Sequence, residues 1–110
     1  MAWISSLLAD ESHTVLKAID DHRIAGFSVV SDGWIDRMYV SPEFQGRGIG
    51  SALIVEAQTQ QAHLELFVFQ QNTSAIRLYE RNGFVLAELR DGSQNEENIP
   101  DARYVWDRAA

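Results

Sequence analysis

The sequence predicts an α+β fold, in which one mixed, mostly antiparallel and twisted sheet has helices packed against it. Three observations lead to this prediction. Short apolar segments separated by turn residues fill the chain up to residue 40, as in antiparallel hairpins. A glycine-rich segment then precedes a helical pattern, and a second helical pattern lies between two later strands. The 110 residues fit a single domain, residues 1–110.

The N-terminal half is expected to contain a meander of three antiparallel strands. Alternating apolar residues predict strands at 14–19, 24–30 and 34–40. The polar segment 20–23 and the segment Ser31-Asp32-Gly33 supply the two turns. Ser41-Pro42 ends the third strand, because proline has no N–H to donate to a ladder.

The C-terminal half is expected to alternate helices with strands. The pattern predicts a helix at 51–61, a strand at 64–69, a helix at 75–82, and strands at 84–89 and 103–106. The continuous apolar run of 64–69 predicts a strand that is buried on both faces. Asn72-Thr73-Ser74 is suited to cap the second helix, and Gly83 is suited to end it.

Composition excludes several classes of function. The chain has no cysteine, which excludes disulfides, thiol nucleophiles and cysteine-based zinc sites. Its net charge is -7 and Lys17 is its single lysine, so no basic stripe for nucleic acid is visible. His13, His22 and His63 lack the spacing of metal ligands, so no metal is expected. Without a basic N-terminal region or a bilayer-spanning apolar run, we expect a cytoplasmic protein that binds no membrane.

A glycine-rich turn between a strand and a helix is suited to hold phosphate. Gln45-Gly46-Arg47-Gly48-Ile49-Gly50 follows the third strand and precedes the first predicted helix of the C-terminal half. N–H groups at a helix N-terminus attract anions, and glycines let an anion approach the backbone closely. A P-loop is excluded because the turn has no lysine. A dinucleotide fingerprint is excluded because the spacing is G-x-G-x-G rather than G-x-G-x-x-G.

This turn resembles the first signature of the GCN5-related N-acetyltransferase (GNAT) superfamily, Gln/Arg-x-x-Gly-x-Gly/Ala, at every specified position. The resemblance implies a GNAT-like acyl-CoA N-acyltransferase fold with acetyl-CoA as the acyl donor. The preceding segment, 38–42, looks like the bulged strand with which the family contacts pantetheine. The cofactor-binding residues implied in this way are Met38, Tyr39, Val40, Gln45, Gly46, Arg47, Gly48, Ile49, Gly50 and Ser51.

A second segment, 72–84, resembles the family's signature N-x-x-A-x-x-x-Y-x-x-x-G-F. By that resemblance Tyr79 is the catalytic general acid, because a protonated phenol can donate a proton to a departing thiolate. Asn72 would contact the cofactor with its side-chain amide. Structural roles are the alternatives: Tyr79 can pack on Phe84 in a Schellman motif, and Asn72 can cap the helix.

Two features depart from the family pattern. Many members carry a glutamate base where this chain has Phe67, so the base is left open. Glu65 and Asp36 are candidates, but the sequence favours surface or strand-edge carboxylates at both positions. The N-terminal part is shortened, which leaves the acceptor pocket open or completed by a second subunit in a homodimer. One short amphipathic helix is predicted there from the helical spacing of Trp3, Ile4, Leu7 and Leu8.

The sequence therefore predicts an N-acetyltransferase that moves an acetyl group from acetyl-CoA to a primary amine of a small molecule or a peptide. The lack of cysteine favours direct transfer in a ternary complex over a thiol acyl-enzyme. The acidic loop 91–101, which includes Glu96 and Glu97, is either a solvated surface loop or a lid that attracts a cationic amine. The alternative function is a non-catalytic acyl-CoA-binding or protein-interaction module with the same fold.

Overall fold

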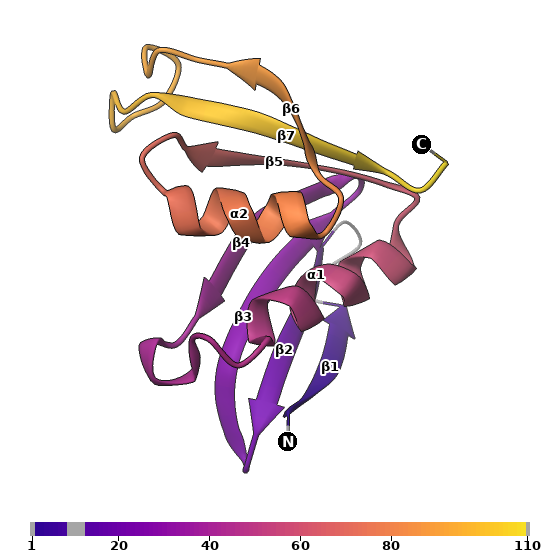
Figure 1. Ribbon diagram of the computed structural model, residues 1–110. Coiled ribbons are helices and arrows are strands. Elements are labelled where there is room, and N and C mark those ends of the chain that lie inside the picture. The colour runs from indigo at the N-terminus through magenta and orange to yellow at the C-terminus, as the bar shows by residue number, and fades with distance from the viewer. Residues whose placement is uncertain (1, 9–12, 110) are drawn as a thin grey trace.

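The described part of the chain forms one sheet of seven strands, with two α-helices on one of its faces. The structure is a computed structural model, which describes residues 2–8 and 13–109. The strands are β1 Ala2–Leu8, β2 His13–Asp20, β3 Arg23–Ser31, β4 Trp34–Val40, β5 His63–Phe69, β6 Val85–Leu89 and β7 Asp101–Asp107. The helices are the 3₁₀ turn η1 Pro42–Phe44 and the α-helices α1 Ile49–Gln60 and α2 Thr73–Arg81 (Figure 1).

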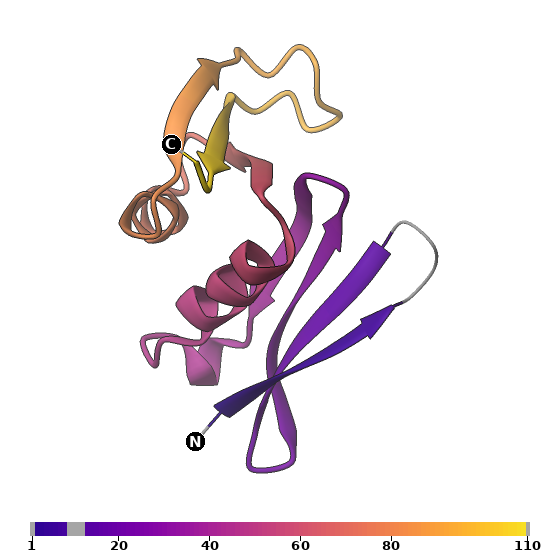
Figure 2. The same cartoon turned by 90° about the vertical axis from the view of Figure 1, so that its right-hand side faces the viewer.

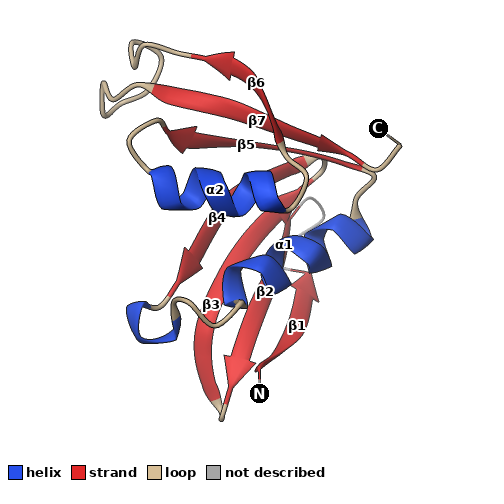
Figure 3. Ribbon diagram, in the orientation of Figure 1, coloured by secondary structure: helices blue, strands red, loops and turns tan. Residues whose placement is uncertain are grey.

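The strand order is β1-β2-β3-β4-β5-β7-β6, and β4 with β5 is its one parallel pair (Figure 3). β1 to β4 form an antiparallel meander, to which the C-terminal strands attach through β5. The predicted α+β fold with a mostly antiparallel sheet is therefore confirmed. Within the described residues, no helix combines the length and the apolar character needed to cross a bilayer.

Both α-helices lie on the same side of the sheet (Figure 2). Leu16 of β2 and Leu66 of β5 point to this side and are buried in a core that includes Leu53 and Ile54 of α1. Successive side chains of a strand alternate between faces, so Val15, which precedes Leu16 on β2, points to the opposite face of the sheet. No helix covers that second face among the described residues, and we call it the second face.

The second predicted helix ends as the sequence indicates. The N–H of Phe84 donates to the carbonyl oxygen of Tyr79 at 3.1 Å, and the N–H of Gly83 donates to that of Glu80 at 3.1 Å. Gly83 has a φ of +91°, which glycine adopts without strain. These two bonds define a Schellman motif and confirm the predicted role of Gly83.

Two sequence predictions are wrong. The expected N-terminal helix is strand β1, which pairs with β2 from Ala2↔Asp20 to Leu8↔Thr14. So short a segment is a marginal helix in water, whereas pairing with β2 satisfies its backbone groups. The strand expected to be buried on both faces, β5, is buried on one only, and Phe67 is 44% exposed. The reason is that both α-helices lie on the other face.

β4 and β5 separate soon after they meet. Their recorded pairing is the single register position Trp34↔Glu65, and the strands then diverge (Figure 1). β4 is bulged, because Val29 pairs with Arg37 while Val30 pairs with Ile35, so Asp36 is an extra residue. The opening between these two strands is where the candidate site lies.

Candidate active site

A groove of about 590 Å³ runs from the end of β4 over the glycine-rich turn to α2. It brings together two segments that the sequence analysis singled out separately. All the predicted cofactor-binding residues line it except Arg47, namely Met38, Tyr39, Val40, Gln45, Gly46, Gly48, Ile49, Gly50, Ser51 and Asn72. Tyr79 of α2 lines it as well.

The glycine-rich turn presents open backbone to this groove. Gly46 and Gly48 both have a φ of +79°, and a Cβ at either position would meet no atom within 4 Å. Gly48 is the N-cap of α1 and offers no side-chain cap, so the N–H groups of the first turn are open to a ligand. Partial positive charge there attracts an anion such as a pyrophosphate.

Two polar residues of the turn are already engaged. The Gln45 side-chain amide donates to the carbonyl oxygen of Val40 at 3.3 Å, which ties the turn to the end of β4. The Arg47 guanidinium lies 5.6 Å from the centre of the Phe44 ring and outside the groove lining. Arg47 therefore lies outside the groove, whose lining offers an anion the backbone N–H groups at the start of α1 and the side chain of Arg81 of α2.

A second cavity, of about 410 Å³, lies in the opening between β4 and β5. It shares Met38, Asn72 and Tyr79 with the groove, so the two spaces meet at these three residues. Asp36 and Phe67 also line it, and both are exposed residues away from the helices. The cavity therefore leads from the helix-covered side of the sheet towards the second face.

Tyr79 sits where the two spaces meet. Its side chain is buried, and its ring lies 5.9 Å from that of Phe84, as the Schellman motif predicts. Burial raises the pKa of the Tyr79 hydroxyl above its ordinary value, so the group stays protonated at neutral pH. The Tyr79 ring therefore packs on Phe84 while the residue also lines both the groove and the cavity.

Asn72 also combines a structural role with a place in the site. Its side-chain oxygen accepts a hydrogen bond from the N–H of Ala75 at 3.3 Å, which is the predicted helix cap. The same residue lines both the groove and the cavity. A cap that is fixed in this way presents its remaining amide group in a defined direction.

The two candidate bases differ sharply in their surroundings. Glu65 accepts from Arg103 at 2.6 Å and pairs with His63 at 2.9 Å. Hydrogen bonding to His63, and then to Arg103, lowers the pKa of Glu65 despite its partial burial. Glu65 is also absent from the cavity lining, whereas Asp36 lines the cavity and lies 3.8 Å from the His13 imidazole. Of the two carboxylates, Asp36 has the access that a base requires.

The loop between β6 and β7 is closed at its base by a buried ion pair that the sequence analysis missed. Asp101 is only 4% exposed, and both of its oxygens accept from the Arg90 guanidinium at 2.7 Å. The Gln70 amide donates to the backbone carbonyl oxygens of both residues. The sequence contained a signal for this ion pair, because Arg90 and Asp101 have opposite charges and lie at the two ends of a loop that joins adjacent strands.

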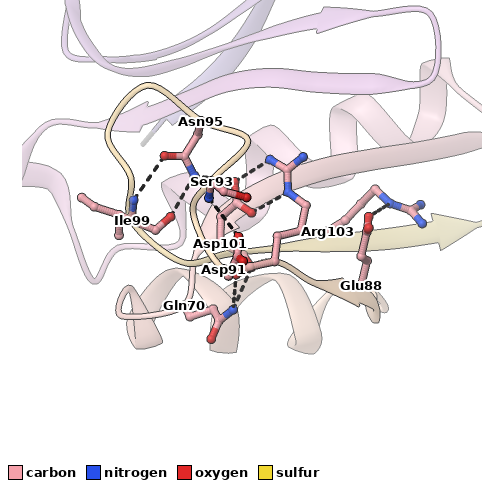
Figure 4. Close-up of polar contacts among 9 residues, drawn as sticks. Gln70, Glu88, Asp91, Ser93, Asn95, Ile99, Asp101 and Arg103 are labelled. Atoms are coloured by element: carbon pink, nitrogen blue, oxygen red, sulfur yellow. Dashed lines mark hydrogen bonds and ion pairs between the residues drawn. The ribbon is translucent and has the colours of Figure 1, made fainter.

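The loop itself is held by its own side chains (Figure 4). The Asn95 amide donates to the carbonyl oxygen of Ile99 at 2.8 Å and accepts from its N–H at 3.2 Å. Glu97 lines the cavity, but Glu96 is not among the lining residues. The loop is thus an ordered wall of the cavity, with one of its two adjacent glutamates facing inwards.

Phe67, at the position where the resemblance implies a glutamate, contacts two other residues. The Phe67 ring stacks on the Trp34 ring, with 5.5 Å between the ring centres. The Arg90 guanidinium lies 4.1 Å from the centre of the Phe67 ring. Arg90 therefore connects the base of the loop to this side of the cavity. An aromatic surface takes the place of a carboxylate at this position.

Comparison with known proteins accords with this geometry. Residues 11–86 match the acetyltransferase (GNAT) domain family. The peptidyl-lysine N-acetyltransferase YiaC of Escherichia coli strain K12 is 33% identical over 88 residues, which are 79% of this chain and 59% of that protein. This chain therefore spans about three fifths of the length of that relative.

Two solved structures share the fold. Nourseothricin acetyltransferase is 27% identical with a TM-score of 0.77, over 92% of this chain and 69% of that chain. An acetyltransferase from Bacillus anthracis strain Ames in complex with acetyl coenzyme A has a TM-score of 0.81 at 18% identity, over 91% of this chain and 65% of that chain. Because the family match covers more than half of its residues, this chain belongs to the GNAT acetyltransferase family.

Proposed function

We propose that this protein transfers an acetyl group from acetyl-CoA directly to a primary amine within a ternary complex. The observation that carries the proposal is the meeting of two spaces at Tyr79. The groove has the open helix N-terminus and the glycine turn that suit a pyrophosphate. The cavity has an exposed carboxylate, Asp36, and leads to the second face. Donor and acceptor can therefore approach the same point from opposite sides.

The chain's residues divide the chemistry between them. The backbone of β4 beyond Trp34 faces the opening between β4 and β5, so Met38, Tyr39 and Val40 can bond the extended pantetheine arm. The acceptor amine forms the new C–N bond with the acetyl carbon, and the C–S bond breaks. Tyr79 donates its proton to the departing sulfur, and burial, which raises the pKa of its hydroxyl, keeps that hydroxyl protonated at neutral pH until the thiolate forms. We assign the acceptance of the amine proton to Asp36, directly or through water.

The acceptor that we propose is a lysine side chain in a peptide, with small primary amines as weaker substrates. The relative from Escherichia coli is named for peptidyl-lysine. Three carboxylates and two guanidinium groups line the cavity, and Arg90 is paired with Asp101. Asp36 and Glu97 outnumber the remaining cation, Arg37, which favours a cationic amine. We also predict a cytoplasmic location, which cell fractionation tests, and a homodimer, which light scattering tests.

The deciding experiment measures binding and turnover separately. Calorimetric titration with acetyl-CoA should show binding, and release of the CoA thiol should then depend on an added amine. Binding without amine-dependent thiol release would support the acyl-CoA-binding module instead. No binding would reject the donor.

The assignment of the base has its own matched test. An Asp36→Asn variant should lower kcat by about tenfold or more, because a positioned base contributes at least this much. Glu65→Gln removes a carboxylate outside the cavity and should change kcat little. Equal effects of both substitutions on kcat would withdraw the role given to Asp36.

A further inference from the structure

The cavity between β4 and β5, into which we propose that the acceptor amine enters, is called the acceptor cavity from here on. The second face carries a shallow groove beside it. Four residues line this groove of about 450 Å³, which we call the flanking groove: Phe27, Arg37, Met38 and Tyr39. Arg37 and Met38 also line the acceptor cavity, so the two spaces are continuous. A molecule whose amine enters the cavity therefore has the flanking groove within its reach.

The flanking groove is apolar and aromatic. Phe27 and Tyr39 are opposite each other on β3 and β4, and their ring centres are 5.9 Å apart. Tyr39 is 52% exposed, although it is a large aromatic residue. Val29 continues the apolar surface, since it is opposite Arg37 in the β3–β4 register. An apolar side chain of a ligand would cover the Phe27–Tyr39 pair and remove apolar surface from water.

Two cationic residues border this surface, and the carboxylate of Asp36 lies in the neighbouring cavity. Lys17 is in the same cross-strand row as Phe27 and Tyr39, and Arg37 borders the groove. Among the residues that the structure describes, Arg37 has no ion-pair partner. In a chain with a net charge of -7, two cations around one apolar groove select an acidic ligand group.

We propose that the flanking groove binds the residues next to the acceptor lysine of a protein or peptide, and that it selects an apolar side chain with an acidic neighbour. This inference rests on the proposed function and specifies its substrate. The groove and the cavity share Arg37 and Met38 in their linings, and an extended peptide advances only about 3.3 Å per residue, so residues close to the lysine are the ones placed against the groove. A free polyamine fits less well, because its further cationic groups would lie against Arg37 and Lys17.

The test compares two blocked peptides that each contain one lysine. In one peptide the neighbours of the lysine are Leu and Glu, and in the other they are Gly and Gln. The wild-type protein should use the Leu/Glu peptide with a kcat/KM about tenfold higher, as expected for one buried apolar side chain. Equal values for the two peptides, or a higher value for spermidine, would overturn the proposal.

Variants locate the preference. Phe27→Ala should remove most of the preference and leave the acetylation of a blocked single lysine unchanged. Val15→Ala, a truncation on the same face outside the groove, should keep the preference. Arg37→Glu should reverse the choice between peptides with a glutamate or a lysine beside the acceptor. Retention of the full preference in a folded Phe27→Ala protein, checked by thermal unfolding, would contradict the assignment.

A binding measurement keeps this inference separate from the proposed function. Calorimetric titration of both peptides onto the CoA-saturated protein should give an affinity about tenfold higher for the Leu/Glu peptide. If no amine supports thiol release but this difference in affinity persists, the transfer reaction is wrong and the flanking groove stands. If thiol release occurs and the affinities are equal, the reaction stands and the flanking groove is wrong.

Discussion

The cofactor groove and the acceptor cavity are neighbours, but they are built in different ways. The groove is made from two continuous segments: the end of β4 with the turn and the start of α1, and one side of α2 along its whole length. The cavity takes residues from β4, β5, α2 and the β6–β7 loop. The groove uses backbone groups, whereas the cavity uses side chains. Specificity for the acceptor can therefore change by substitution while the donor site is kept.

The largest effect is expected where the two regions meet. Tyr79→Phe keeps the ring packed on Phe84 but removes the proton donor. We expect kcat to fall by about a hundredfold, within the range usual for general acids, with an unchanged Kd for acetyl-CoA. Single-turnover kinetics and calorimetric titration check the two halves of this statement. An unchanged kcat would leave Tyr79 with a packing role alone.

The next effect concerns the loop between β6 and β7, which forms one wall of the acceptor cavity. Asp101→Asn removes the charge that pairs with Arg90 in a buried position, and should lower the free energy of unfolding by about 2 kcal/mol. Hydrogen bonding to Arg90 lowers the pKa of Asp101, so its contribution is present above the unfolded-state pKa of about 3.9. It is lost as the pH falls below that value.

Denaturant unfolding between pH 3 and 7 measures this contribution. The difference in stability between the wild type and Asp101→Asn should be full at pH 7 and shrink below about pH 4. A difference that is independent of pH would mean that the ion pair is not the cause. Donor affinity should stay unchanged, because Asp101 is not part of the cofactor groove.

A glycine substitution separates donor binding from backbone strain. Gly48→Ala places a Cβ at a φ of +79° on the groove lining, and should weaken acetyl-CoA binding by about tenfold. Gly33 also has a φ of +79°, but it lies in the β3–β4 turn outside the groove, so Gly33→Ala causes the same backbone strain away from the donor site. Both variants should lose about 1 kcal/mol of stability. Equal donor affinities in the two variants would contradict the role of Gly48.

The smallest effect tests the lid hypothesis for the acidic loop. Glu97→Gln should raise the acceptor KM by about threefold, as expected for one partly screened charge. Glu96→Gln, its neighbour outside the cavity lining, should leave KM unchanged. Measurement at low and high salt should show the difference decreasing with ionic strength. Identical kinetics for both variants would favour a plain surface loop.

Local features of the structure could be predicted well from the sequence. The turn at Gly46 to Gly50, the cap at Asn72 and the helix end at Gly83 all follow from backbone preferences of single residues and their neighbours. The positions of β2, β3 and β4 followed from alternation and turn residues. These features depend on contacts within a few residues, and the sequence contains that information directly.

The proposed acceptor side could not be predicted from the sequence. The expected N-terminal helix is strand β1, and Phe67 is exposed. Glu65 is paired with His63 and Arg103, whereas Asp36 lines the cavity. Each outcome depends on which strands are neighbours and on which face the helices lie. Those choices are set by the summed burial and backbone pairing of distant segments. The glycine-rich turn was therefore predictable from local sequence, whereas access to the cavity beside it depends on how distant segments pack.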